Sequence, residues 1–325
     1  MSQPGRTLGM GEQEAFEGRF VDAPFGHALL EAARDDDRIV GLTADLGKYT
    51  DILPFAQAHP DRFFNVGMAE QNLIAVSAGL AKVGRVAFCT TYGVFATRRA
   101  YDFIAIACAH SKLNVKIIAG LPGLTTGYGG THQAIEDTGL VRLIPGLVVI
   151  DPCDATEVHE ATLAIAKHDG PVYMRLPRGK VPVLLGAGVA PFEIGKVRRL
   201  RQGSRVGIVS TGLLTGPALE AAASLHSQGI DAGVLHVPCI KPFDDEGVAA
   251  FASECDAVIT AENHVIDGGL GTLVIQSLYR AGVHKPLRHI GLPDQFIECG
   301  SVPHLQRKYA ITADDIVDAA RQLTS

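Results

Sequence analysis

Residues 65–89 read NVGMAEQNLIAVSAGLAKVGRVAFC, and this stretch predicts one repeating unit of an α/β sheet. A turn containing Gly67 leads into a long apolar helix over Ala69–Val83, and a strand over Arg85–Cys89 follows. The strand shows little alternation of polar and apolar residues, which is typical of a strand whose sheet is covered by helices on both faces. The stretch therefore predicts a parallel sheet inside two helical layers.

The same pattern continues on both sides of this unit. In the first half of the chain we expect further strands and helices over Ile39–Thr43, Phe95–Ala109, Val115–Ala119, Leu147–Ile150, Ala155–Lys167 and Val172–Arg175. Residues 177–191 are rich in Pro, Gly and Val and indicate a linker. A second strand–helix series runs over residues 206–323. We therefore predict an α/β fold of two domains, residues 20–185 and 190–325, each a mainly parallel sheet flanked by helices, after a flexible tail over residues 1–19.

Composition excludes several classes of protein. The formal net charge is −6, whereas a nucleic-acid-binding surface is usually basic. No apolar run approaches the roughly 20 residues that span a bilayer. The six cysteines show no paired spacing, which argues against a zinc site or a disulfide framework. Thiols of this kind are typical of a reducing compartment, so we expect a cytoplasmic protein.

Glu70 is the first candidate for chemistry, because it falls in the first turn of the expected helix. Position alone allows a structural role, since an acid there stabilises a helix by about 0.3–1 kcal/mol. The sequence around it allows a more specific interpretation. The stretches that carry it are Asn65–Asn72, Thr91–Tyr101, Gly129–Asp137, Ile144–Pro152, Arg175–Arg178, Ile240–Asp244 and Glu262–Gly271.

In order and content these stretches resemble those of the transketolase-like thiamine diphosphate enzymes. The resemblance covers nearly the whole chain after residue 20 and identifies the expected domains as a pyrimidine-binding domain and a transketolase C-terminal domain, the second serving dimerisation. It implies that Glu70 is the carboxyl group that binds the cofactor's aminopyrimidine. It also implies cofactor contacts by Asp45, Tyr92, Phe95 and Arg98. Read from the residues alone, Tyr92 and Phe95 could be core packing and Asp45 a helix cap or turn former.

The substrate residues implied by the resemblance are His132, Tyr128 and Arg178. His132 would contact a substrate hydroxyl and move its proton, so it is a second candidate catalytic residue. Arg178 would bind an anionic group on the sugar, although a surface ion pair is an equal alternative. Tyr128 stands in the stretch where relatives carry an acid that touches a substrate hydroxyl. The segment 120–123 also lacks a basic residue, and Asp22 lies where transketolases carry a phosphate-binding arginine, so we expect substrates other than the usual pentose phosphates.

The family's Gly-Asp-Gly motif, which holds the magnesium ion at the diphosphate, is missing from this sequence. We therefore expect no metal ligands on this chain. Thiamine diphosphate and Mg²⁺ would be shared with a separate N-terminal transketolase subunit, in a heterotetramer of two copies of each chain.

The expected function is the small subunit of a two-component transketolase, which transfers a two-carbon ketol unit from a ketose to an aldose. Two alternatives stay open. The beta subunits of 2-oxoacid dehydrogenases share the two-domain plan. A non-catalytic scaffold or regulatory subunit could have kept the fold, and Tyr128, Leu121 and Asp22 give this alternative some weight.

Overall fold

The computed structural model describes residues 19–186 and 188–324. Apart from Arg19, the tail expected over residues 1–19 lies outside this part of the chain. Among the described residues, no helix has both the length and the apolar character needed to cross a membrane.

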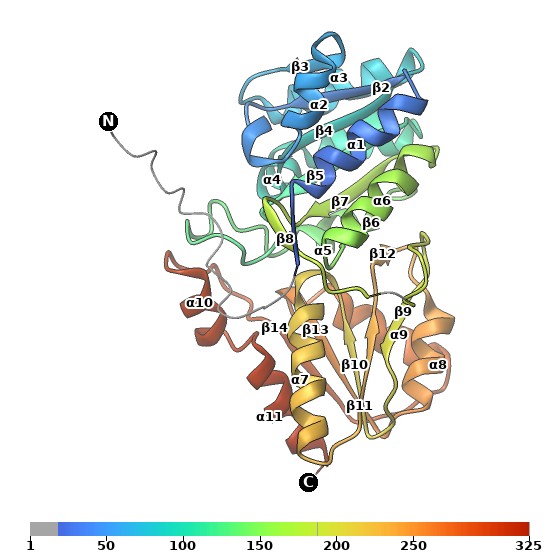
Figure 1. Cartoon of the computed structure of the whole chain (residues 1–325), viewed down its shortest axis with the longest axis vertical. Helices are drawn as coiled ribbons and strands as arrows, with labels where there is room; N and C mark the ends of the chain where they lie inside the picture. Colours follow the sequence, from blue (N-terminus) through green and yellow to red (C-terminus); the bar gives the residue numbers. More distant parts are fainter. Residues whose placement is uncertain (1–18, 187, 325) are drawn as a thin grey trace.

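The first domain is built around a seven-stranded sheet, in the upper half of Figure 1. In spatial order its strands are β12 (Cys239–Lys241), β6 (Val148–Ile150), β7 (Val172–Leu176), β5 (Val115–Gly120), β4 (Val86–Tyr92), β2 (Ile39–Thr43) and β3 (Phe63–Asn65). All neighbouring strands run parallel except β12, which is antiparallel to β6. The expected parallel sheet is confirmed.

Helices cover both faces of this sheet. They are α1 (Pro24–Asp35), α2 (Leu53–Ala58), α3 (Glu70–Lys82), α4 (Gly93–Phe103), α5 (Asp137–Val141) and α6 (Ala155–Lys167), and α4 continues into a π-helical segment over Ile104–His110. Strand β4 shows why the sequence did not alternate. Ala87 and Cys89 face the core formed with α3 and α4, whereas Val86 and Phe88 face the core formed with α1 and α6.

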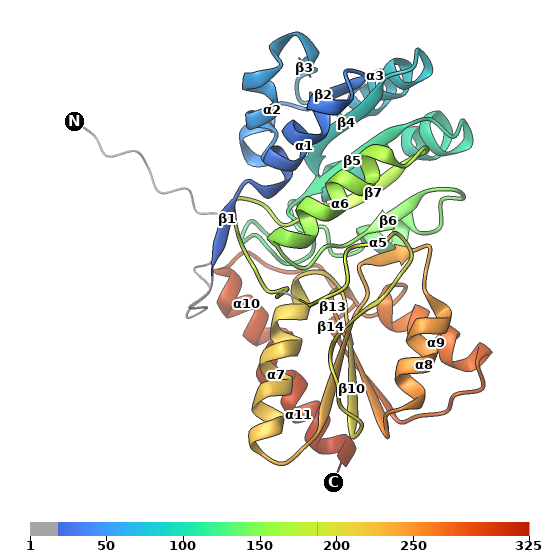
Figure 2. The ribbon, with the colours of Figure 1, turned by 45° about the vertical axis from the view of Figure 1, so that its right-hand side comes forward.

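The second domain contains a five-stranded sheet, below the first in Figure 2. Its strands are β14 (Leu287–Leu292), β13 (Ala257–Val265), β10 (Val206–Ser210), β11 (Ala232–His236) and β9 (Arg198–Arg201), of which β9 alone pairs antiparallel. One face packs against α7 (Thr215–Ser227) and α11 (Ala313–Thr324), the other against α8 (Asp245–Ser253) and α9 (Leu270–Arg280). A short helix, α10 (Val302–Lys308), precedes α11.

The two domains are joined by more than a linker. Strand β12 comes from the second half of the chain but completes the edge of the first sheet. Inside the expected linker, β8 (Lys180–Pro182) pairs with β1 (Phe20–Asp22). One continuous apolar core also contains residues of α3 and α4 together with residues of α8 and α9. The domains therefore share packing as well as chain connections.

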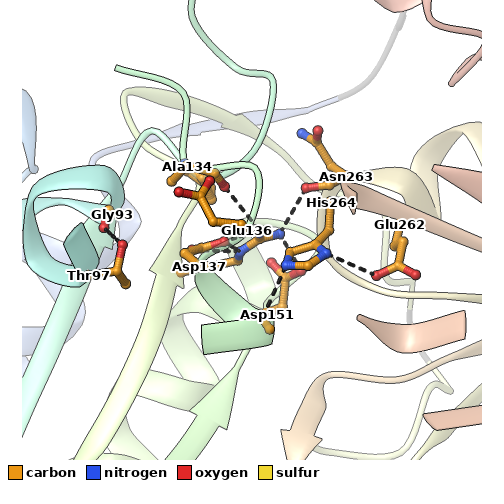
Figure 3. A network of polar contacts seen from close by, with 12 residues as sticks. Gly93, Thr97, Ala134, Glu136, Asp137, Asp151, Glu262, Asn263 and His264 are labelled. Carbon is orange, nitrogen blue, oxygen red and sulfur yellow. Dashed lines mark hydrogen bonds and ion pairs between the residues drawn. The ribbon is translucent and has the colours of Figure 1, made fainter. Parts of the chain in front are cut away.

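A buried ionic cluster lies where the domains meet (Figure 3). Its cation is Arg175 at 1% exposure, which forms ion pairs with the carboxylates of Asp137 and Asp151. The guanidinium also donates to the backbone carbonyl of Asn263, in the second domain, at 3.2 Å. Tyr173 adds a hydrogen bond to Asp137 at 2.7 Å. Burial alone would raise the pKa of Asp137, but Arg175 outweighs it and lowers that pKa below its usual value, so Asp137 is ionised at neutral pH.

A second buried cluster joins the domains on the side of α6. Glu157 accepts from His236 of β11 at 2.6 Å and from Arg198 of β9 at 2.8 Å. Burial would raise the pKa of Glu157, yet these two partners lower it to about 2. The Cys153 thiol lies beside this carboxylate and could complete a set of metal ligands. However, the Glu157 carboxylate is already paired with the Arg198 cation, so the cluster is explained as an internal ion pair.

We predict that Asp137→Ala lowers the free energy of unfolding by about 3–5 kcal/mol, because it removes the main counter-charge of a buried cation. Urea unfolding of the whole chain measures the loss. Asp318→Ala is the matched control, since Asp318 forms an exposed pair with Arg321, and its effect should stay within about 0.5 kcal/mol. Equal losses in the two variants would contradict the importance given to the buried cluster.

Candidate active site

Apart from Arg98, the expected site residues gather at one edge of the first sheet, beyond the carboxyl ends of its parallel strands. In open α/β sheets this edge is where ligands bind. Five of the strands contribute one position each: Asp45 follows β2, Glu70 follows β3, Tyr92 ends β4, the 121–134 loop follows β5, and Arg178 follows β7. The 121–134 loop carries Tyr128 and His132.

Glu70 is the first residue of α3 and is buried, with 6% of its surface exposed. The positive end of the helix dipole favours its negative charge. Arg99 of α4 donates to Oε1 of this carboxylate at 2.9 Å. Within the described part of the chain, the structure records no partner for the other oxygen, Oε2. Glu70 can therefore form one more hydrogen bond without losing its ion pair.

A cluster of aromatic rings is linked to this carboxylate through Arg99. The Arg99 guanidinium lies 4.0 Å from the centre of the Phe95 ring. The Phe95 ring centre is 5.7 Å from that of Tyr92 and 5.4 Å from that of His132. Tyr128 completes the group, with its ring centre 5.5 Å from His132. The structure thus brings together Glu70, Tyr92, Phe95, His132 and Tyr128.

His132 is half-buried, and burial is the main cause that lowers its pKa. The positive charge of Arg99 lowers the same pKa further. The imidazole is therefore neutral at pH 7, the state that can both accept and donate a proton. Its Nδ1 lies 2.9 Å from the Thr131 hydroxyl, so Nε2 is the nitrogen left for a ligand.

Arg98 does not join this group. Its guanidinium forms an ion pair with Glu136 and donates to the carbonyls of Gly130 at 2.6 Å and Gln133 at 3.3 Å. Arg98 therefore supports the loop, and its neighbour Arg99 is the arginine that contacts Glu70 and Phe95. The cofactor contact expected of Arg98 stays a prediction.

Asp45 lies behind the turn that leads to Glu70. Asn65 donates to the Asp45 carboxylate at 2.9 Å, and its Oδ1 accepts the backbone N–H groups of Asp45 and Gly67, each at 3.0 Å. Asp45 itself adopts a left-handed conformation, with φ of 58°. These contacts hold the turn before α3, so Asp45 is placed to fix the position of Glu70.

Burial raises the pKa values of Tyr92 and Asp51 above their usual range. The positive charge of Arg178 lies close enough to both groups to offset part of this effect. Among the residues that the structure describes, no hydrogen-bond partner reaches the buried Nε of Arg178. Arg178 therefore offers a donor to a ligand.

A recess of about 620 Å³ lies elsewhere, at the amino ends of β2, β5 and β7, and none of the expected site residues lines it. Its walls carry mixed charges, including Glu31, Asp35, Arg38 and Lys167. The site residues and this recess lie at opposite ends of the sheet.

Comparison with known families agrees with the geometry. Residues 21–183 match the family model described as transketolase, pyrimidine binding domain, and residues 195–316 match transketolase, C-terminal domain. The chain belongs to the transketolase family. Family membership implies the use of thiamine diphosphate, and transferase chemistry, for this transketolase-family chain.

Several relatives match this transketolase-family chain over most of their own length. A transketolase family protein of Sinorhizobium fredii is 54% identical over 91% of this chain and 86% of its own length. The 6-deoxy-6-sulfo-D-fructose transketolase subunit SqwH of a Clostridium species is 42% identical over 91% and 92%. A solved chain described as split gene transketolase, inactive beta4 tetramer, is 40% identical with a TM-score of 0.86, covering 93% of this chain and 97% of that one. Against 1-deoxy-D-xylulose-5-phosphate synthases, such as that of Heliobacterium modesticaldum, the chain spans about half the relative's length.

The sequence did not single out every residue that the site uses. Arg99 was inside a quoted stretch, but nothing distinguished it from Arg98. Asn65 and Asp51 bind the turns that carry Glu70 and Arg178, through Gly67 and Gly179. Asn65 ends β3, so a polar residue at the carboxyl end of a parallel strand was a signal that could have found it.

We predict that Arg99→Met raises the pKa of His132 toward its usual value without restoring it fully, because the neighbouring charge is removed and burial stays. NMR titration of the histidine ring protons measures this, with the resonance assigned by His132→Asn. Arg321→Met is the control, since Arg321 lies on α11 in the second domain. An unchanged His132 pKa in Arg99→Met would show that the two groups do not face each other in solution.

Proposed function

We propose that this chain is the small subunit of a two-component transketolase, which transfers a two-carbon ketol unit from a ketose donor to an aldose acceptor. The observation that carries the proposal is Glu70, a buried carboxylate with one oxygen left open among the described residues, which Arg99 links to the ring of Phe95 and its neighbour Tyr92. This donor set fits an aminopyrimidine, which presents a ring nitrogen and a flat apolar face. The relatives named as a transketolase subunit and as a split-gene transketolase support the same function.

In this proposal Glu70 shares a proton with N1′ of the aminopyrimidine, and Tyr92 and Phe95 pack against the ring. When bound, thiamine diphosphate supplies the carbon nucleophile and the electron sink for breaking the donor's carbon–carbon bond. Asp45 and Asn65 fix the turn before Glu70. His132 takes a proton from the donor's hydroxyl group at Nε2, and Tyr128 and Arg178 orient the sugar.

The proposal includes a separate partner subunit. We place the diphosphate and its Mg²⁺ on that partner, in a heterotetramer of two copies of each chain. The beta4 tetramer of the split-gene relative is described as inactive, which supports a requirement for a second kind of chain. The relative in Methanocaldococcus jannaschii, named as a transketolase C-terminal section, is 38% identical over 90% of this chain and 92% of its own length.

A low-charge anion at the far end of the sugar is the substrate feature that the structure favours. The open Nε of Arg178 can donate to an anion, but the carboxyl group of Asp51 lies close by, and Asp22 is near enough to raise the pKa of Asp51. Two acids near one cation disfavour a phosphate dianion more than a singly charged sulfonate. The sulfofructose transketolase relative acts on a sugar of that kind. We therefore propose a 6-sulfonated ketose as a candidate donor.

We predict that Glu70→Gln lowers ketol transfer from hydroxypyruvate to an aldose at least about 100-fold in the reconstituted complex, because the proton-sharing carboxyl is lost. Size-exclusion chromatography should show unchanged assembly. The isolated chain should bind thiamine diphosphate weakly by calorimetry, and a tight complex without a partner would overturn the two-component part of the proposal.

Two other results would overturn the catalytic part. Unchanged turnover in Glu70→Gln would favour a scaffold or regulatory role. Transfer of an acyl group to lipoamide without ketol transfer would favour a 2-oxoacid dehydrogenase.

We predict that Arg178→Met raises KM for a 6-sulfonated ketose about 10- to 100-fold, the cost of losing a charge-assisted hydrogen bond. The uncharged ketose erythrulose should be transferred at the wild-type rate. Lys180→Met is the matched control, because Lys180 is an exposed cation two residues away. Equal effects of Arg178→Met on both donors would exclude a role in anion recognition.

A further inference from the structure

The 121–134 loop is closed at its neck by its own backbone. Gly123 donates to the carbonyl of Ala134 at 2.8 Å, so the two ends of the loop meet. Inside the loop, the Gln133 side chain donates to the carbonyl of Thr126 at 2.9 Å. A closed loop of this kind moves as a unit, and its position determines where Tyr128 and His132 lie.

The second domain holds the neck of this loop. The Asn263 side chain accepts the backbone N–H of Leu124 at 2.8 Å. A Cβ on Gly123 would lie 2.3 Å from the backbone oxygen of Asn263, so the two domains touch here without room for a side chain. The neck is therefore fixed by a residue 139 positions away in sequence.

The second domain also reaches the tip of the loop, through a segment that we name the brace, residues 296–300. Gly300 donates to the carbonyl of Gly127 at 3.1 Å, and Tyr128 and Cys299 form an antiparallel bridge. Ile297 is buried in the core of the second domain at 2% exposure. The brace is thus rooted in one domain and paired with the candidate substrate loop of the other.

Two glycines of the loop allow this close contact, because a side chain at either position would crowd the brace. A Cβ on Gly127 would lie 2.2 Å from the backbone oxygen of Gly300, and one on Gly130 would lie 3.1 Å from Cδ1 of Phe296. Arg98 adds a further contact, because its guanidinium is 5.6 Å from the centre of the Phe296 ring while it donates to the Gly130 carbonyl. The Phe296 ring is nevertheless 77% exposed, so it lies at the surface beside Gly130 of the loop.

We propose that the brace is part of the substrate site, and that Phe296 is a positioning residue that helps to select the sugar. It acts through Gly130 and Arg98 on the loop that carries Tyr128 and His132. In this view the second domain takes part in substrate selection in addition to association. The inference rests on the proposed function, because it requires that Tyr128 and His132 contact the substrate.

The test compares Phe296→Ala with the conservative variant Phe296→Tyr in the reconstituted complex, with hydroxypyruvate as donor and glycolaldehyde or glyceraldehyde as acceptor. Val83→Ala is the control, since Val83 is 77% exposed and lies just after the far end of α3. Displacing a loop that orients substrate should lower kcat/KM of Phe296→Ala about 10-fold or more. The ratio of kcat/KM for the two aldehydes should also change, while the thiamine diphosphate concentration for half-activation stays constant.

Hydrogen exchange on the chain alone gives a second readout. Amides of residues 121–134 should exchange faster in Phe296→Ala, and Phe296→Tyr and Val83→Ala should match the wild type in both experiments. An unchanged aldehyde ratio in Phe296→Ala overturns the inference, even if exchange rises, because the brace is then only structural. A wild-type complex without ketol transfer overturns the proposed function instead, and this separates the two failures.

Discussion

The arrangement of this protein depends on one buried cation, the guanidinium of Arg175. A charge at 1% exposure is stable only when its partners are fixed around it, because no water can replace them. The partners come from separate segments: Asp137 begins α5, Asp151 follows β6, and Asn263 belongs to β13 in the second domain. Arg175 also donates to the carbonyl of Ala134, at the neck of the 121–134 loop. A single ionic cluster therefore fixes the domain interface and one end of the candidate substrate loop together.

This cluster explains why the stretches that identified the family are spread over the sequence. Asp137, Asp151, Arg175 and the Glu262–His264 segment each lie in a different stretch, and the fold brings them into one buried network. His264 accepts the backbone N–H of Gly139 at 3.1 Å, and Glu262 accepts two backbone N–H groups at the start of α9. Many of the residues in the stretches that resemble the family thus belong to the domain interface that supports the site, and fewer belong to the site itself. Glu70 and His132 lie outside the buried network.

The sequence predicted the parts of the fold that local patterns determine. The strand Ile39–Thr43 and the helix Ala155–Lys167 occur at the expected residues, because hydrophobic period and the Asp154 cap define them locally. It missed β12, whose place at the edge of the first sheet depends on a partner about 90 residues earlier. It also could not separate Arg98 from Arg99. Adjacent helical residues point about 100° apart, so only the packed helix shows which guanidinium faces Glu70. The sequence did not predict the brace either, because its contacts, like those of β12, are with residues distant in sequence.

If the proposed function holds, the charges around the site decide which sugar it binds. Arg99 is already paired with Glu70, so its charge is largely compensated. Arg178 retains an open donor, but strand pairing of β1 with β8 brings Asp22 opposite Lys180 and close to Asp51. In the proposed site, Tyr128 offers a hydroxyl group and carries no negative charge at neutral pH. In the proposed function, the Nε of Arg178, which has no partner among the described residues, the neutral His132 and the aromatic rings suit a polar substrate that carries a single negative charge.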